Sequence, residues 1–166
     1  MVEAGSRFVT VLWDAPDGYS WDSHRSSQHL EKHLVPGFAQ AFSALLVDLE
    51  DRGLLEETLV VAGGEMGRTP HTPKITKTCG RDHHVNGYSI FMAGGGFRGG
   101  YVHGATDEWG HYAAENIVKH TDYHYTLLHL FGLAPEKLVY KRNGREQSLI
   151  DDQPGRIVSE LLKRPV

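Results

Sequence analysis

The stretch "LLVDLEDRGLLEETLVVAGGEMGRTP", residues 45–70, contains the end of a predicted helix, a predicted strand and a polar loop. The helix begins near Pro36, which suits a first helical turn, and ends at Gly53, a typical residue just beyond a helix C-terminus. Its apolar side chains recur with the spacing of one buried helix face: Phe38, Ala41, Phe42, Leu45, Leu46 and Leu49. The apolar run "TLVVAGG" (58–64) then predicts a strand covered on both faces of a sheet.

The segments on either side extend this pattern of helices and strands. Helices are predicted over 120–132, where Thr121 is the expected N-cap, and over 156–164. Further strands are predicted from runs rich in β-branched and aromatic residues: 7–13, 88–95 and a shorter one within 99–108. The predicted fold class is therefore α/β, with several strands of one sheet flanked by helices.

Composition narrows the classes of protein that fit. The 166 residues suffice for one domain, and a net charge of −4 without a basic stripe argues against nucleic-acid binding. The apolar runs are too short to span a membrane, and we expect no signal peptide in the first residues of the given sequence. Because the chain enters a predicted strand at once, we expect a missing upstream part. Cys79 is the single cysteine, which excludes a disulfide framework, whereas eleven histidines favour a metal site.

Three polar clusters adjoin predicted strands: "WDSH" (21–24), "GGEMGRTP" (63–70) and "GRDHH" (80–84). Ligands of open α/β sheets bind outside the carboxyl ends of the strands, so we expect these clusters to converge. Together they offer the mixed oxygen and nitrogen ligands that suit zinc or manganese. The candidate ligands are Asp22, His24, Glu65, Asp82, and His83 or His84. Arg68 could bind an oxyanion through two parallel hydrogen bonds.

Each of these signals also has a simpler interpretation. Glu65 could pair with Arg68 or cap a helix, and Asp82 could pair with Arg81 or form an Asx turn. Two histidine pairs have helical spacing, His29 with His33 and His120 with His124. The first pair is expected to be solvated, and His124 is expected to pack rather than to bind a ligand. His103 and His111 have no clear carboxylate partner in the sequence.

The order of these motifs resembles one bacterial family, the domain-of-unknown-function family numbered 1501. The resemblance covers residues 3–163 and rests on "WDSH", residues 45–70, "GRDHH", and three later segments: "FMAGGGFRGGYVHGATDE", "LLHLFGLAPEKLVY" and "NGREQSLIDD". This family is placed in the alkaline phosphatase/sulfatase-like superfamily. The resemblance implies a three-layer α/β/α fold, of which the chain would hold the C-terminal part of a single domain.

The same resemblance implies roles for individual residues. Asp22 and His24 resemble the ligand pair of a first metal, His83 the later histidine that completes that site, and Glu65 a ligand of a second metal. One or two divalent ions are implied: zinc, manganese, calcium or magnesium. Two residues would act in catalysis, Arg68 by binding the substrate oxyanion and Asp82 by orienting a histidine ligand.

The chain departs from the superfamily by an absence. Superfamily members carry an early strand with a metal-binding aspartate and a nucleophilic serine, threonine or cysteine, and the matching region would lie before Met1. We therefore expect part of a hydrolase of sulfate or phosphate esters, inactive alone, whose substrate is a small-molecule or glycan ester. Full-length relatives typically carry an export signal and would be periplasmic or exported. The alternatives are a non-catalytic exported binding protein that keeps this fold, and a broken gene product without function.

Overall fold

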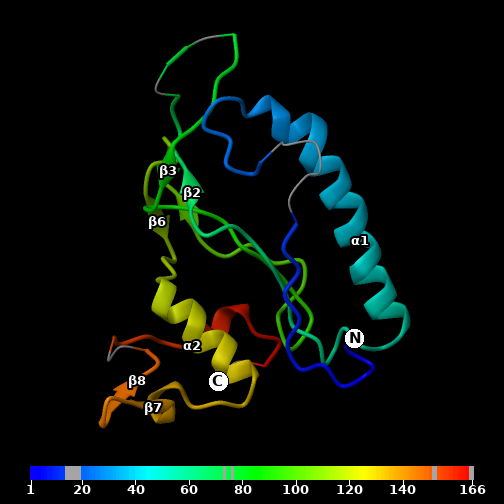
Figure 1. Cartoon of the computed structure of the whole chain (residues 1–166), viewed down its shortest axis with the longest axis vertical. Helices are drawn as coiled ribbons and strands as arrows, with labels where there is room; N and C mark the ends of the chain where they lie inside the picture. Colours follow the sequence, from blue (N-terminus) through cyan, green and yellow to red (C-terminus); the bar gives the residue numbers. More distant parts are fainter. Residues whose placement is uncertain (14–19, 73, 76, 151–152, 165–166) are drawn as a thin grey trace. The chain divides into compact units, whose positions relative to one another are not determined.

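The long helix predicted before Gly53 is confirmed. In the computed structural model, helix α1 spans Val35–Asp51 and continues a π-helical turn, Leu30–Leu34 (Figure 1). Gly53 has a φ of +69°, and its amide N–H donates to the carbonyl oxygen of Glu50 at 2.9 Å. Because a side chain is strained at this φ, glycine allows the chain to leave the helix here.

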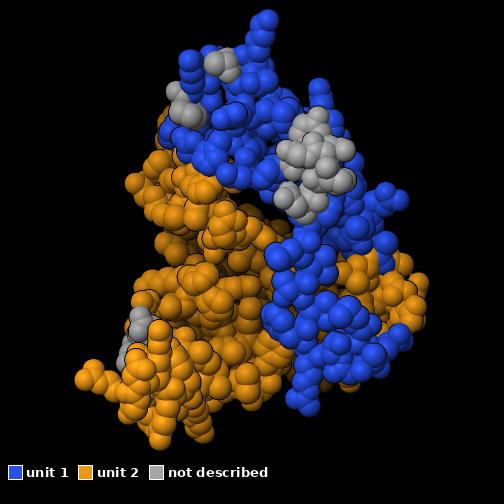
Figure 2. Space-filling view, in the orientation of Figure 1, with its two compact units in different colours: residues 1–44, 71–82 blue, residues 45–70, 83–166 orange. Residues whose placement is uncertain are grey.

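The structure describes residues 1–13, 20–72, 74–75, 77–150 and 153–164. These residues form two units, which are coloured separately in Figure 2. Unit 1 consists of residues 1–44 and 71–82, and unit 2 of residues 45–70 and 83–166. Among the described residues, no helix is both long enough and apolar enough to cross a membrane.

Unit 1 is organised around the N-terminal part of α1. Phe38 on this helix stacks on Phe42 with ring centroids 5.1 Å apart, and Trp21 meets Phe38 edge-on at 5.9 Å. Such aromatic contacts add to the stability gained by burying the rings. Leu34 in the π-helical turn is fully buried. These contacts hold the segment that contains "WDSH" against the helix.

The strand predicted over 7–13 is wrong, since these residues form no regular secondary structure. Phe8 and Leu12 expose 79% and 92% of their surface. A strand is stabilised by hydrogen bonds to a neighbouring strand, and no strand in the described part of the chain pairs with this segment. β-Branched and aromatic composition indicates a preference for strand geometry but cannot supply the partner.

Unit 2 contains four antiparallel strand pairs. They are β1 (Val60–Ala62) with β4 (Phe91–Ala93), β2 (Gly67–Arg68) with β3 (His83–His84), β5 (Ala105–Thr106) with β6 (Ala113–Glu115), and β7 (Val139–Arg142) with β8 (Arg145–Ser148). The predicted strands 58–64 and 88–95 are therefore confirmed only at their centres. The chain is mixed α/β, as predicted, but the described strands form two-stranded sheets rather than one sheet covered on both faces.

Glycines explain why the pair formed by β1 and β4 is short. Gly94 follows the last residue of β4 with a φ of +66°, a conformation that ends an extended strand. A Cβ atom at Gly94 would overlap the backbone carbonyl oxygens of Thr58 and Leu55. The close approach of two backbones thus requires glycine immediately after the third residue pair of this sheet.

Helix α2, His120–Leu130, confirms the helix predicted over 120–132, but its N-cap is Lys119 rather than Thr121. The helix predicted over 156–164 is wrong, because only a 3-10 turn forms there, Ser159–Leu161. Residues on both sides of this turn also bond to other segments of the chain. The Arg156 amide donates to the Asp122 carboxylate on α2, and Leu162 forms an antiparallel bridge with Phe97. A further 3-10 turn, Pro135–Lys137, follows α2.

Candidate metal centre

Two loops of unit 1 are held together by their backbones. The Ser27 amide donates to the Cys79 carbonyl oxygen at 2.9 Å, and the Arg81 amide donates to the Ser23 carbonyl oxygen at 3.4 Å. Between these bonds, a Cβ atom at Gly80 would overlap the carbonyl groups of Ser23 and His24. Because glycine has no Cβ atom, the backbone of "GRD" can lie directly on the backbone of "WDSH".

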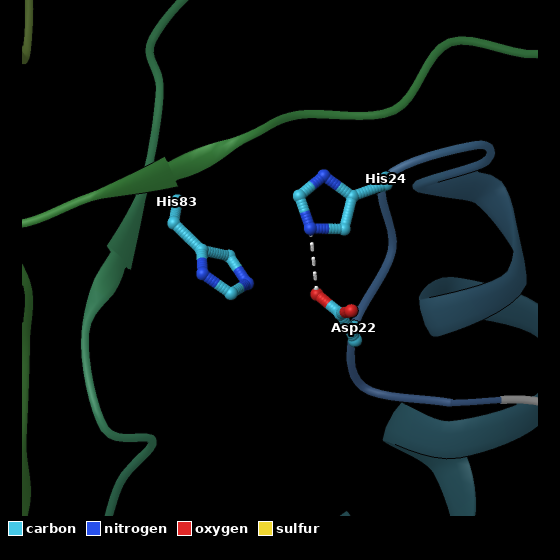
Figure 3. A group of neighbouring side chains, drawn as sticks. All are labelled: Asp22, His24 and His83. Atoms are coloured by element: carbon cyan, nitrogen blue, oxygen red, sulfur yellow. Dashed lines mark ion pairs between the residues drawn. The ribbon is translucent and has the colours of Figure 1, made fainter.

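This contact places the His24 imidazole between two carboxylates. Its Nδ1 atom donates to Oδ1 of Asp82 at 2.8 Å, and its Nε2 atom lies 3.1 Å from Oδ1 of Asp22. Figure 3 shows the latter contact. The His24 side chain is 40% exposed and both carboxylates are 53% exposed, so the cluster is open to solvent. The prediction that "WDSH" and the start of "GRDHH" converge is therefore confirmed for Asp22, His24 and Asp82.

The two histidines of "GRDHH", both in unit 2, differ in their exposure to solvent. His84 is 8% exposed, and its Nε2 atom donates to the backbone carbonyl oxygen of His111. A carbonyl oxygen only accepts hydrogen bonds, so this nitrogen carries the proton and has no lone pair for a metal. His83, in contrast, is exposed on strand β3. The choice of His83 over His84 as a candidate ligand, which the residues alone left open, agrees with this difference in burial.

Strand β2 carries the predicted oxyanion-binding residue. Arg68 lies directly opposite His83 in the antiparallel pair of β2 with β3. Side chains of directly opposed residues project from the same face of a sheet, so Arg68 and His83 are neighbours. Glu65 is exposed and lies two residues before β2, outside the strand pair. In unit 2, Arg68 therefore lies beside His83, whereas Glu65 is not part of the strand pair that contains them.

One carboxylate in a well-defined environment was not among the predicted site residues. The Asp107 carboxylate accepts the backbone amides of His111 at 2.7 Å and Tyr112 at 3.1 Å. The bond from the His111 amide is the main reason why the pKa of Asp107 is lowered. Asp107 therefore fixes the conformation of the loop that contains His111, and the carbonyl oxygen of His111 accepts a hydrogen bond from His84. The "TDE" sequence is typical of many turns and gave no signal for this role.

A family model described as "Protein of unknown function (DUF1501)" matches residues 1–162. No curated protein and no solved structure matches the chain.

Proposed function

The chain belongs to the DUF1501 family, as the sequence predicted. We propose that it contributes to a divalent-metal centre for the hydrolysis of sulfate or phosphate esters. The observation that carries the proposal is the position of His24 between Asp22 and Asp82. Membership of the alkaline phosphatase/sulfatase-like superfamily, with its three-layer α/β/α fold, is part of the same proposal and rests on the resemblance in sequence.

The geometry of Asp22 and His24 supports a shared metal ion. The two facing atoms are a carboxylate oxygen and an imidazole nitrogen, 3.1 Å apart. Two ligand atoms, each about 2.1 Å from one ion, lie about 3 Å apart when their bonds meet near a right angle. The pair of oxygen and nitrogen donors suits zinc and manganese. Magnesium and calcium prefer all-oxygen sites, which this pair does not provide.

Asp82 supports the same interpretation from the other side of the ring. Its carboxylate accepts the Nδ1 proton of His24, which leaves the Nε2 lone pair available beside Asp22. Histidine ligands commonly donate their second nitrogen to a carboxylate in this way, and the bond fixes the ring's orientation and tautomer. The proposed role of Asp82 is therefore to position His24 rather than to bind the metal.

The resemblance adds the remaining parts of the proposed centre. His83 and Glu65 would be further ligands, and the guanidinium group of Arg68 would bind the sulfate or phosphate group through parallel hydrogen bonds. A bound divalent ion would polarise the ester's phosphoryl or sulfuryl oxygen. The superfamily nucleophile has no counterpart among the residues that we assign, so we propose that this chain alone binds the oxyanion without turnover.

The first test is binding of Mn²⁺, which prefers oxygen-containing sites, measured by calorimetry on the metal-free chain. We expect one ion per chain, and we expect His24→Ala to lower the affinity at least about tenfold while the protein stays folded. His29→Ala is the matched control, because His29 is another exposed histidine of unit 1. Equal Mn²⁺ binding by wild type and His24→Ala would overturn the proposed centre.

The second test asks whether the proposed centre binds the oxyanion that an ester hydrolase would release. Inorganic phosphate and sulfate, the products of the two ester classes, are titrated into the Mn²⁺-loaded chain. We expect one of them to bind only with Mn²⁺ present, and Arg68→Gln to abolish binding while Arg164→Gln, at an exposed position, retains it. The preferred oxyanion identifies the ester class. Mn²⁺ binding without affinity for either oxyanion would favour the non-catalytic binding protein.

A further inference from the structure

Helix α2 carries a second pair of imidazoles that the proposed centre does not use. His120 and His124 are four residues apart and therefore lie on the same helix face. Their Nε2 atoms are 2.9 Å apart, and their rings meet nearly perpendicularly with centroids 4.4 Å apart. Both side chains are exposed. His124, which we expected to pack rather than to bind a ligand, contacts the Tyr123 ring, and its Nε2 atom faces that of His120 at the surface.

We propose that His120 and His124 form a separate metal site, which binds a divalent cation of the Cu²⁺ or Ni²⁺ type through both Nε2 atoms. The helix holds the two nitrogens at this separation without any loop having to move. Imidazole is a preferred ligand of these ions. Together with the proposed centre, the chain would then have two metal sites of different ligand chemistry.

The distance between the nitrogens indicates which ions fit. Two metal–nitrogen bonds of about 2.05 Å place the nitrogens about 2.9 Å apart at a right angle and about 3.3 Å apart at the tetrahedral angle. The observed 2.9 Å matches the right angle. Square-planar and tetragonal coordination is typical of Cu²⁺ and Ni²⁺, whereas structural Zn²⁺ is tetrahedral. The pair therefore suits Cu²⁺ or Ni²⁺.

The two Nε2 atoms share one hydrogen bond, so one ring must move its proton to Nδ1 before both nitrogens bind a cation. Partial burial is the main reason why the pKa of His124 lies below its usual value of 6.5, and the charge of His120 lowers it further. A neutral imidazole is the form that binds metals. Tyr123 packs against both rings, and burial raises the pKa of its phenol, which therefore stays neutral. The Asp122 carboxylate already accepts two backbone amides, from Lys119 and Arg156.

A second pair of histidines, in unit 1, can be compared with His120 and His124. His29 and His33 have the same spacing in sequence, but His33 lies in the π-helical turn, and their ring centroids are 6.0 Å apart. A π-helical turn contains more residues than an α-helical turn, so positions four apart are no longer aligned along the axis. A variant that lacks His29 and His33 removes the same number of histidines as one that lacks His120 and His124.

The experiment uses the full-length chain with His24→Ala, so that the proposed centre cannot contribute. Cu²⁺ is added to one equivalent, and electron paramagnetic resonance records the nitrogen couplings. We expect two coordinated imidazoles, with one remaining after His124→Gln or His120→Gln, and a loss of affinity of roughly tenfold or more, because the helix holds the second ligand at high effective concentration. We expect the His29→Ala/His33→Ala variant to bind Cu²⁺ unchanged.

Thermal unfolding provides a second readout. A cation that binds only the folded helix raises the melting temperature, and we expect this increase to disappear in both glutamine variants but not in the His29→Ala/His33→Ala control. An unchanged Cu²⁺ spectrum and affinity in His120→Gln and His124→Gln would overturn the site and leave a hydrogen bond between imidazoles. Because His24→Ala is present throughout, that result would not bear on the proposed ester-hydrolase centre.

Discussion

At the scale of single residues, the candidate metal centre depends on a glycine, because any side chain at that position would collide with the neighbouring backbone. Gly80 lies on the carbonyl groups of Ser23 and His24, where a Cβ atom has no room. The hydrogen bond from His24 to Asp82 joins residues that are 58 positions apart. This long-range contact is possible only because the two backbones approach this closely.

We predict that Gly80→Ala destabilises the chain by about 1–3 kcal/mol, the usual cost of inserting a group into a packed site. Denaturant unfolding measures the change. The same substitution should weaken Mn²⁺ binding, because it separates Asp82 from His24. Gly99→Ala is the control, since a Cβ atom at Gly99 would meet nothing within 4 Å. Equal stability of the two variants would contradict the proposed packing.

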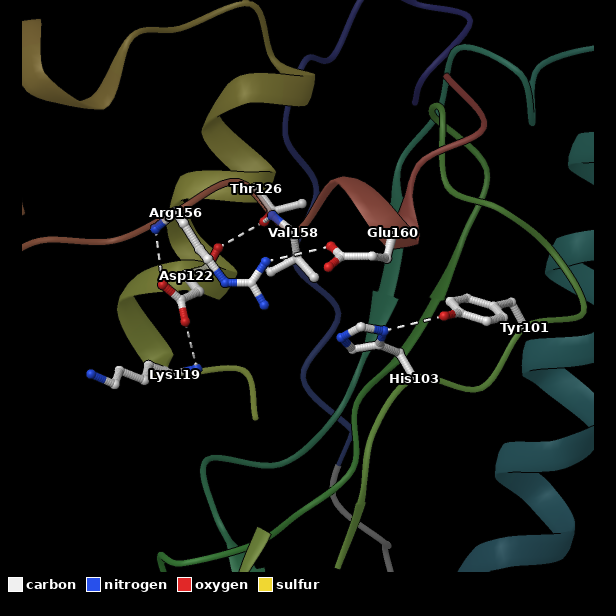
Figure 4. A network of polar contacts seen from close by, with 8 residues as sticks. All are labelled: Tyr101, His103, Lys119, Asp122, Thr126, Arg156, Val158 and Glu160. Atoms are coloured by element: carbon white, nitrogen blue, oxygen red, sulfur yellow. Dashed lines mark hydrogen bonds and ion pairs between the residues drawn. The ribbon is translucent and has the colours of Figure 1, made fainter. Parts of the chain in front are cut away.

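At the scale of secondary structure elements, helix α2 fixes the C-terminal segment through buried polar groups. Asp122 is 7% exposed, and its carboxylate accepts the amides of Lys119 at 3.0 Å and Arg156 at 2.9 Å. One turn later, the Thr126 hydroxyl oxygen accepts the Val158 amide at 3.0 Å. Figure 4 shows this network. These bonds satisfy the backbone amides of Arg156 and Val158 and hold this segment against α2.

We predict that Asp122→Ala and Thr126→Val each destabilise the chain by about 1–3 kcal/mol. The first removes a buried carboxylate that accepts two backbone amides, and the second leaves the buried Val158 amide without its acceptor. Asp122→Asn, which keeps one acceptor oxygen, should lose less stability than Asp122→Ala. The matched control is Asp48→Ala, which removes an exposed ion pair with Arg52 that is worth at most about 1 kcal/mol. Thermal unfolding measures the loss of stability in each variant. A loss in Asp48→Ala as large as that in Asp122→Ala would refute the role of the network.

At the scale of the whole molecule, the two units bury apolar side chains to very different extents. Unit 2 contains nearly all the buried apolar residues of the described chain: Leu49, Val60, Phe97, Tyr125, Val158 and Leu162. In unit 1, Leu34 is fully buried, while Phe8, Val11 and Leu12 are mostly exposed. Exposed apolar side chains favour association with other surfaces where they form a contiguous patch.

This contrast predicts opposite outcomes for two leucines of unit 1. Leu34→Ala should cost about 2–5 kcal/mol, because it opens a cavity at a fully buried position. Leu12→Ser should change the free energy of unfolding by less than about 0.5 kcal/mol, because the side chain is almost wholly exposed. It should also reduce concentration-dependent self-association, measured by light scattering. A large loss of stability in Leu12→Ser would show that residues 7–13 are packed in solution.

The sequence by itself determined the features that depend on near neighbours. Helices α1 and α2 were predicted correctly because helical hydrogen bonds join residues four apart, and apolar spacing indicates a helix. The apolar face predicted for α1 is wrong in its burial, since Leu49 is the one buried residue among its six members. The end of α1 at Gly53 was predicted for the same reason, since it depends on the φ preference of one residue. The family was recognised from motif order, and "WDSH" and "GRD" were correctly expected to meet.

Tertiary structure alone decided which segments pair. Residues 7–13 and 156–164 have the composition of a strand and a helix, but distant partners, or their absence from the described chain, gave them other conformations. The sequence could not show that His84 is held by the His111 carbonyl 27 residues away, nor that the nitrogens of His120 and His124 lie 2.9 Å apart. Such contacts depend on how the whole chain folds back, which no local pattern records.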